Sequence, residues 1–251
     1  MFIDSHCHLS VKDYENIENV IKEAKENNVK KLIVSGCDKE SIIESIDIAA
    51  QYDNIYLSLG FHPSEANKTT QEDIEWLKEI IKSNKKVVAI GEIGLDYYWE
   101  KDNKEKQKEM FENMLLLSKE LNLPVVIHSR DAFQDTYDIL KKYDVKGVIH
   151  CFSGNLENAK KYIKLGFILG IGGVVTFKNT NLKEVIKNLD LENIILETDS
   201  PYLAPTPFRG NQNSPKYIPI IAEEISNIKQ IKIEEVMEKT TENVKKVFRT
   251  I

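Results

Sequence analysis

The chain opens with the stretch Phe2-Ile3-Asp4-Ser5-His6-Cys7-His8-Leu9, an apolar run that ends in a His-x-His pair. This pattern predicts a short β-strand. Because side chains alternate along an extended chain, His6 and His8 leave the strand on the same face, where two imidazoles can share a metal ion. Taken alone, the pair is more simply explained as two polar residues in a frayed N-terminus. Its meaning therefore depends on what the other strands contribute.

Seven further apolar runs, rich in Val and Ile, alternate with longer charged segments of helical period. This alternation is typical of repeated β-strand and α-helix units. Eight parallel strands are best accommodated in a (β/α)8 TIM barrel, here expected with distorted closure and an extra C-terminal helix; an open doubly wound sheet is the competing fold. The expected strands are residues 1–8, 31–36, 55–60, 87–91, 125–128, 147–150, 167–171 and 194–198.

A single domain covering residues 1–251 is the expected organisation. A chain of 251 residues has the usual size of such a barrel. Hydrophobic residues make up 41% of it and charged residues 29%, as in a globular protein with a substantial core. Closing helices are expected over 218–227 and 233–248. The prolines that gather in 201–215 predict a long rigid loop after the eighth strand, and no Pro/Gly/Ser-rich linker marks a second domain.

The formal net charge of −6 argues against a protein that binds nucleic acid by bulk electrostatics, because such proteins are usually basic. It leaves room for an enzyme that holds a few phosphates locally. Three cysteines without a Cys-x-x-Cys pair indicate neither a disulfide framework nor a cysteine zinc site. No basic segment precedes the first apolar residues, and no apolar stretch is long enough to cross a bilayer. We therefore expect a cytoplasmic protein without membrane contact or an obligate protein partner.

The histidines all fall at the carboxyl ends of expected strands, at His6, His8, His62, His128 and His150. Histidines placed for solubility or packing would also occur in the long helical segments, which contain none. The carboxyl ends of the strands form the active face of a barrel, so these imidazoles are expected to lie near one another.

Two carboxylates occupy equivalent positions, because Glu92 and Asp199 each directly follow an apolar strand. Either one alone is more simply a helix N-cap or a solvated loop residue. A buried acid, however, needs a partner or a metal, because an unpaired buried charge is costly. Together with imidazoles from strands one, five and six, the two acids predict a site for two divalent ions with Glu92 bridging, which is the composition of a two-metal hydrolase.

Five motifs, in order along the chain, resemble those of the TatD family, which are metal-dependent DNases of the amidohydrolase superfamily with a TIM barrel fold. The likeness extends over essentially the whole chain. Ser10 departs from it, since an acid or amide is expected after His-x-His-Leu, and this affects the surroundings of the site rather than its ligands. The motifs are Asp4-Ser5-His6-Cys7-His8, Gly91-Glu92-Ile93-Gly94-Leu95-Asp96-Tyr97, His128-Ser129-Arg130, His150-Cys151-Phe152-Ser153-Gly154 and Glu197-Thr198-Asp199-Ser200-Pro201-Tyr202-Leu203.

The resemblance implies two divalent ions joined by one bridging carboxylate. Imidazole ligands ordinarily suit zinc, manganese or iron better than magnesium, whereas the family is described as magnesium-dependent. We expect the purified protein to carry zinc or another transition ion and to work with added magnesium or manganese. The implied ligands are His6, His8 and Asp199 for one ion, His128 and His150 for the other, and Glu92 as the bridge.

The resemblance also implies a deoxyribonuclease that hydrolyses phosphodiester bonds in DNA, with single strands or 3′ ends as substrate and 3′-to-5′ exonuclease action. In that mechanism a metal-activated water attacks phosphorus and Asp199 takes its proton. His62 would contact the scissile phosphate or the leaving group, or would only hold the turn before Pro63. The alternatives are an amidohydrolase, an esterase or a D-aminoacyl-tRNA deacylase on the same metals and, from a different class, an inactive binding scaffold.

Arginine usage favours an anionic substrate, because Arg130 and Arg209 lie in the loops after strands five and eight. A guanidinium makes bidentate contacts to phosphate that lysine cannot reproduce. A salt bridge to a nearby loop acid is the alternative for Arg130. Tyr202 is expected to stack on a base or simply to pack its loop. Lys178, just beyond the glycine-rich seventh strand, is a further candidate for a phosphate contact.

Overall fold

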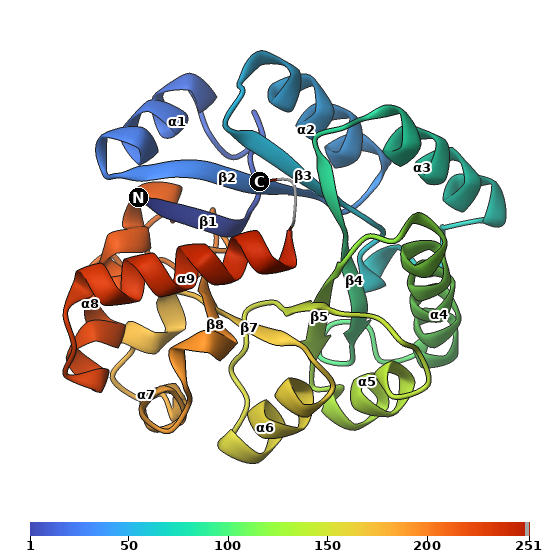
Figure 1. The fold of residues 1–251 in the computed structure, drawn as a ribbon. Coiled ribbons are helices and arrows are strands. Elements are labelled where there is room, and N and C mark those ends of the chain that lie inside the picture. The colour runs from blue at the N-terminus through green and yellow to red at the C-terminus, as the bar shows by residue number, and fades with distance from the viewer. Residues whose placement is uncertain (249–250) are drawn as a thin grey trace.

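Eight parallel strands form one sheet in the computed structural model, which describes residues 1–248 and 251. Each strand pairs with the next one along the chain, and β8 returns to the side of β1 (Figure 1). The predicted (β/α)8 TIM barrel is therefore confirmed, because a doubly wound sheet would place its strands in a different order. The strands are β1 (Phe2–Cys7), β2 (Val29–Gly36), β3 (Ile55–Leu59), β4 (Val87–Asp96), β5 (Val125–Arg130), β6 (Gly147–Ile149), β7 (Ile168–Ile171) and β8 (Ile194–Leu196).

Among the described residues, no strand ladder joins β8 to β1 at the seam of the barrel. Parallel ladders join each strand to the next from β1 to β8, with register shifts in the β1–β2, β3–β4 and β4–β5 pairs. At the seam, bonds beyond the strand ends take over: the amide of Asp199 donates to the carbonyl of His6 over 3.0 Å, and the amide of His8 donates to the carbonyl of Ser200 over 2.7 Å. This nearly closed arrangement places the residues that follow β8 directly beside the end of β1.

A helix follows each strand from β1 to β7, and α8 and α9 follow β8 (Figure 1). Side chains fix some helix starts, since Asp38 caps α2 and Thr70 caps α3 by accepting a hydrogen bond from a backbone amide of the first turn. No helix within residues 1–248 is both long and apolar enough to cross a membrane. The helices are α1 (Ile17–Glu26), α2 (Lys39–Gln51), α3 (Gln71–Ser83), α4 (Lys104–Leu121), α5 (Phe133–Leu140), α6 (Leu156–Lys164), α7 (Leu182–Lys187), α8 (Ile218–Lys229) and α9 (Ile233–Val247), with short 3-10 turns η1 (Pro63–Glu65), η2 (Gly173–Thr176), η3 (Leu191–Asn193) and η4 (Pro215–Tyr217).

The extra C-terminal helix closes the amino-terminal end of the barrel. Figure 1 shows α9 running across the barrel close to the N-terminus. Val244 of α9 and Phe248 just beyond it pack against inward-facing strand residues such as Ile3 and Val88, and Phe248 is fully buried. A second and larger apolar layer lies between the sheet and the surrounding helices. The end of the barrel that can hold a site is therefore the opposite one, at the carboxyl ends of the strands.

Strand β4 is longer than the sequence predicts, because it continues past residue 91 to Asp96. Glu92 thus lies within the strand and not after it. The pairing of β4 with β5 shifts register between Ile90 and Ile93. Gly94 has a φ of +141° and lies so close to β5 that a Cβ atom there would be 2.0 Å from the carbonyl oxygen of His128. Only glycine permits this approach, and the irregular segment carries Glu92 at the barrel mouth.

Candidate metal centre

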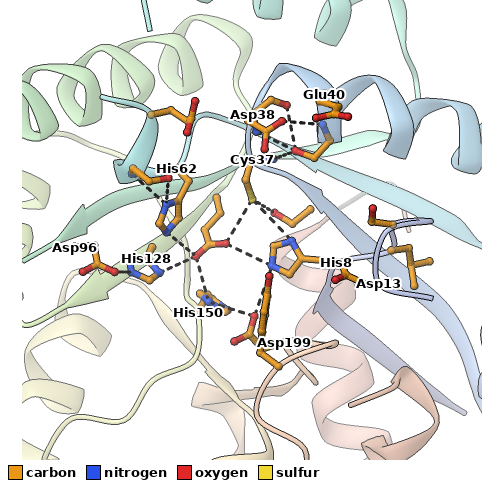
Figure 2. Close-up of a pocket in the computed structure, with 18 of the residues that line it drawn as sticks. His8, Asp13, Cys37, Asp38, Glu40, His62, Asp96, His128, His150 and Asp199 are labelled. Carbon is orange, nitrogen blue, oxygen red and sulfur yellow. Dashed lines mark hydrogen bonds and ion pairs between the residues drawn. The ribbon is translucent and has the colours of Figure 1, made fainter. Parts of the chain in front are cut away.

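Side chains from five strands meet at the carboxyl-terminal mouth of the barrel (Figure 2). His6, His8, His128, His150 and Asp199 lie near or just beyond a strand end, whereas Glu92 lies within β4 at its irregular segment. Most are deeply buried: His6 is 1% exposed, Glu92 4% and His150 6%. The converging residues are the six proposed ligands, namely His6 and His8 from β1, Glu92 from β4, His128 from β5, His150 after β6 and Asp199 after β8.

Glu92 stands between two pairs of histidines. Its Oε2 atom lies 3.5 Å from His6 Nε2 and 3.8 Å from His8 Nε2. Its Oε1 atom faces the other way, 2.7 Å from His128 Nδ1 and 3.4 Å from His150 Nε2. Each carboxylate oxygen therefore serves a separate pair of imidazoles, which is the arrangement expected of a bridging carboxylate.

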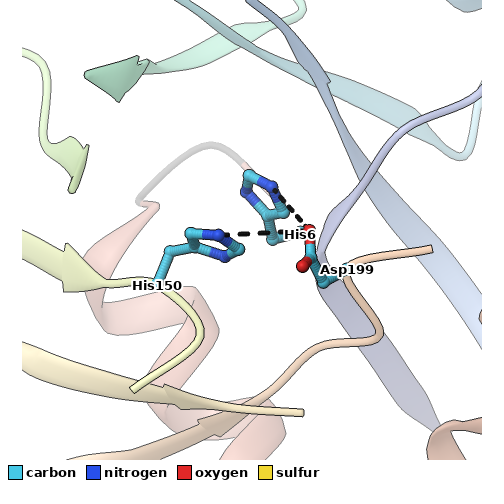
Figure 3. A group of neighbouring side chains, drawn as sticks. All are labelled: His6, His150 and Asp199. Atoms are coloured by element: carbon cyan, nitrogen blue, oxygen red, sulfur yellow. Dashed lines mark ion pairs between the residues drawn. The ribbon is translucent and has the colours of Figure 1, made fainter. Parts of the chain in front are cut away.

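Asp199 completes the half of the site that β1 supplies. Its Oδ1 atom lies 3.7 Å from His6 Nε2, 3.6 Å from His8 Nε2 and 4.0 Å from His150 Nε2. Figure 3 shows Asp199 facing His6 and His150, whose rings stack at 3.9 Å between centroids. Asp199 has a left-handed backbone with a φ of 55°, which aspartate tolerates better than most residues. The backbone bonds of the seam hold it in this position.

The protonation states of the cluster depend on burial and on the neighbouring charges. Burial alone would raise the pKa of Glu92, but His150 and the hydrogen bonds from His128 and His6 hold it well below its usual range. Burial lowers the pKa of His6, and the neighbouring His150 lowers it further. Burial opposes a charge on His150 as well, yet Glu197 and Glu92 raise its pKa to about 10. Glu92 is thus ionised, and the neighbouring imidazoles differ in how strongly they hold a proton.

This donor set fits a divalent metal ion. Five sets of three donor atoms lie within 4.8 Å of one another in the described residues, and three of them consist of proposed ligands alone: His6, His8 and Glu92; His6, His150 and Asp199; and Glu92, His128 and His150. Nitrogen and carboxylate donors of this kind suit zinc and other transition ions. Because protons and metal ions compete for these atoms, metal binding here would release protons.

Two further acids orient the histidines from behind, and the sequence analysis did not single them out. Glu197 Oε1 accepts a hydrogen bond from His150 Nδ1 at 2.9 Å, which leaves Nε2 of that ring facing Glu92. Asp96 Oδ2 lies 3.0 Å from His128 Nε2, which leaves Nδ1 of that ring facing Glu92. Carboxylates placed in this way fix the ring orientation of metal-binding histidines. Their signal in the sequence was their place in two of the quoted motifs.

Cys37 is another residue of the site that the sequence did not indicate. It follows β2, and its Sγ atom lies 3.6 Å from Glu92 Oε2 and 4.0 Å from His8 Nδ1 (Figure 2). Burial raises the pKa of its thiol, so the group is neutral in this setting. A single cysteine without a Cys-x-x-Cys spacing gave no reason to place it here.

A cavity of about 660 Å³ lies over the cluster. Its wall contains His62, Arg130 and Tyr202, three of the residues expected to contact substrate. The other two residues lie elsewhere: Arg209 stacks on the ring of Phe177 at 4.4 Å, and neither Arg209 nor Lys178 is among the described residues that line this cavity. Both belong to loops whose course the strand pattern does not specify.

His62 and Arg130 differ in their surroundings. The ring of His62 lies with Nε2 3.9 Å from Glu92 Oε1, and its Nδ1 accepts a hydrogen bond from the amide of Ser64. Burial lowers the pKa of His62 to about 4, so its ring is neutral with the proton on Nε2. Arg130 forms no ion pair with any carboxylate in the described part of the chain; its guanidinium stacks on Tyr98 at 4.2 Å. The expected alternative of a salt bridge is thus not what the structure shows.

Comparison with known proteins identifies the family. Residues 3–249 match the family model described as TatD related DNase. An uncharacterized metal-dependent hydrolase, YabD from Bacillus subtilis, is 44% identical over 99% of both chains. YcfH from Escherichia coli, described in the same words, is 37% identical over 98% of this chain and 95% of its own.

Solved structures agree with this match. The TatD homolog YjjV from Escherichia coli has a TM-score of 0.93 and 30% identity, with 100% of this chain and 98% of that chain covered. An organophosphorus hydrolase from Deinococcus radiodurans, at 11% identity and a TM-score of 0.64, shares the fold alone. On the evidence of the site and of these relatives, the chain belongs to the TatD related DNase family and is a metal-dependent hydrolase.

Proposed function

We propose that this protein is a deoxyribonuclease that holds two divalent ions and removes nucleotides from the 3′ end of DNA. The observation that carries the proposal is the placement of Glu92, whose two oxygens face two separate pairs of histidines under one cavity. The family supplies the expectation of DNase activity.

The chain's own residues suggest how the reaction is organised. A bound divalent ion supplies Lewis-acid activation of water and neutralises charge on a phosphate oxygen. Asp199 lines the cavity and is placed to accept the proton of the attacking water. His62 presents its Nε2 proton to the same space and can donate it in a hydrogen bond to a phosphate oxygen. Arg130 is free of carboxylate partners among the described residues and can hold a neighbouring phosphate.

Charge around the cavity supports attack at a strand end. Asp13, Asp38, Glu40 and Glu44 line its β1 and α2 side, and Lys12 is the one basic residue among the described lining residues there. Figure 2 shows Asp13, Asp38 and Glu40 around the cavity. A nucleic acid that continued beyond the cleaved bond toward these acids would be repelled by their negative charge. The chain therefore favours a substrate whose terminal residue lies against this acidic wall. In the proposal, Tyr202 packs beside that terminal residue, while Arg209 and Lys178 reach only nucleotides outside the cavity.

The test is cleavage of DNA labelled at one end, in the presence of defined divalent metals. Wild-type protein should shorten a 5′-labelled single strand in single-nucleotide steps. Glu92→Gln should lower the rate by at least about 100-fold, because it removes the charge between the two halves of the site. Glu223→Gln, on an exposed face of α8, is the matched control and should retain the wild-type rate. A wild-type protein that cleaves no DNA with any metal would refute the proposal.

The same acidic wall favours one alternative, the hydrolysis of an amide or a carboxylic ester in a neutral or cationic substrate. Asp38 and Glu40 would attract such a substrate and repel a nucleic acid. A panel of DNA, RNA, small esters and small amides with the same metals separates the two functions. Loss of ester or amide turnover in Glu92→Gln, with no DNA cleavage by the wild type, would establish the alternative.

A further inference from the structure

The wall of the cavity opposite the acidic side carries an aromatic group that the proposed function does not yet use. Trp99 lies in the turn between β4 and α4 and is 69% exposed, and its neighbour Tyr98 is 45% exposed. Their rings meet edge to face at 4.8 Å. Arg130 covers both, with its guanidinium carbon 4.2 Å from the Tyr98 ring centre and 5.5 Å from that of Trp99. Two exposed aromatic rings and an arginine thus form one group, the Trp99 platform.

The turn that carries the platform is firmly held. Asp96 Oδ1 accepts hydrogen bonds from the amides of Tyr98 and Trp99, both at 2.9 Å. The side chain of Gln107 is fully buried. Its Oε1 accepts a hydrogen bond from the amide of Asp96, and its Nε2 donates to the carbonyls of Asp96 and Glu100. Buried side chains therefore set the backbone position from which Trp99 extends.

The same anchor ties the platform to the metal centre. Asp96 uses one oxygen for the amides of the turn and the other for His128 Nε2. Trp99 and Arg130 line the cavity over the cluster, and Trp99 also borders an adjoining cavity of about 480 Å³. A ligand that extends from one cavity into the other would lie beside Trp99, because this residue lines both.

Charge also favours a polyanion on this side. The adjoining cavity is lined by Lys101, Lys104 and Lys106 together with three acids, so its charges balance. Arg130, which has no carboxylate partner among the described residues, adds a positive charge to the cavity over the metal cluster on this side. The side formed by β1 and α2, in contrast, is acidic. A nucleic-acid strand whose end lies at the metal centre is therefore favoured to leave the cavity on the side of Trp99 and Arg130.

We propose that Trp99 is a stacking platform for one base of the substrate strand, next to the nucleotide that is removed, with Arg130 holding the adjoining phosphate. The inference rests on the proposed function and deepens it. Because stacking on an indole requires an unpaired base with a free face, the substrate class is single-stranded nucleic acid or a frayed end. An aromatic ring accepts any base, so the platform contributes affinity and no sequence preference.

The experiment is a double-mutant cycle that combines a substitution in the protein with removal of one base from the DNA strand. An abasic residue is moved along a single-stranded oligonucleotide, and the KM of each oligonucleotide is measured for wild type and for Trp99→Ala. Trp99→Ala should raise the KM of the intact strand about ten-fold, the size of one lost base–aromatic stack. At one abasic position, next to the removed nucleotide, the KM of wild type should rise by the same factor and that of Trp99→Ala should rise no further. Trp99→Phe should restore most of the affinity.

A binding measurement separates this inference from the proposed function. In Trp76→Phe, Trp99 is the only tryptophan, and its fluorescence should be quenched by a single-stranded oligonucleotide in the presence of a chelator. Quenching without DNA cleavage by the wild type would support the platform while refuting the nuclease. If DNA is cleaved and Trp99→Ala leaves the KM unchanged, the platform is refuted and the nuclease is not. The same holds if the effects on KM of Trp99→Ala and of the abasic residue multiply at every abasic position. A dimer in wild type that Trp99→Ala dissociates would assign the ring to self-association and also refute it.

Discussion

The residues that decide the chemistry of this site include acids that would touch no metal. Glu197 is fully buried, and its Oε1 atom binds both His150 Nδ1 and the amide of Cys151. Its other oxygen has no hydrogen-bond partner among the described residues. Gly170 makes room for it, because a Cβ at that position would lie 2.1 Å from Glu197 Oε2. A buried carboxylate kept at this cost indicates that it serves His150.

Glu197→Gln should weaken metal binding about 10-fold to 100-fold, because it removes the negative charge that supports His150 as a ligand and preserves the shape of the side chain. The measurement is zinc affinity by competition with a chromophoric chelator, and thermal unfolding of the metal-free protein shows whether the fold is intact. Glu223→Gln on α8 is the matched control. Unchanged zinc affinity in a folded Glu197→Gln protein would rule out this role.

At the scale of elements, α9 contributes to the stability of the barrel and takes no part in the candidate site. It covers the end of the barrel away from the metal centre, so its contacts contribute to the core and not to the cavity. Phe248 is 0% exposed and packs with inward-facing side chains of the strands. The element predicted as an extra closing helix thus acts as the floor of the barrel.

Phe248→Ala should lower the free energy of unfolding by about 3–5 kcal/mol, because it removes a large buried ring and leaves a cavity. Urea denaturation measures the change. Lys246→Ala, at an exposed position of α9, should stay within about 0.5 kcal/mol of wild type. Below the unfolding range, Phe248→Ala should bind zinc as tightly as wild type. If Phe248→Ala lost as much zinc affinity as Glu197→Gln, the packing under α9 and the metal site would not be independent.

At the scale of the whole molecule, the proposed metal centre brings together parts of the barrel that lie far apart in the sequence. Its candidate donors come from β1, β4 and β5 and from the segments that follow β6 and β8. An ion that binds only the folded barrel stabilises it by about 2.7 kcal/mol when present at 100 times its dissociation constant. The apolar layers inside and outside the sheet do not depend on it, so the metal-free protein should remain folded with a lower melting temperature.

His6→Ala should reduce the bound metal from about two ions per chain to about one. His6 faces Glu92 Oε2 and Asp199, whereas the pair formed by His128 and His150 faces Glu92 Oε1. The measurement is elemental analysis after dialysis against zinc. His62→Ala is the control and should keep the wild-type content. Loss of both ions in His6→Ala, or of one ion in His62→Ala, would contradict the assignment of His6 and His8 to a separate ion.

Much of the fold could be predicted from local pattern. The two closing helices expected over 218–227 and 233–248 agree with α8 and α9, because their apolar periods lie within the segments themselves. The predicted end of β4 at residue 91 was wrong, because the pairing that extends the strand is made with another segment of the chain. Packing against β5 keeps this segment in the sheet as far as Asp96.

The sequence by itself determined the repeated strand and helix pattern and the candidate ligands at the strand ends, because burial and alternation are local properties of a chain. Only the tertiary structure decided that Glu92 faces two separate pairs of histidines, that Asp96 and Glu197 stand behind them, and that Trp99 lies at the rim. These relations join residues on different strands and loops, and their distances are set by how the barrel closes. The opening pair shows the difference: alternation places His6 and His8 on one face, but only the seam with β8 brings Asp199 to them.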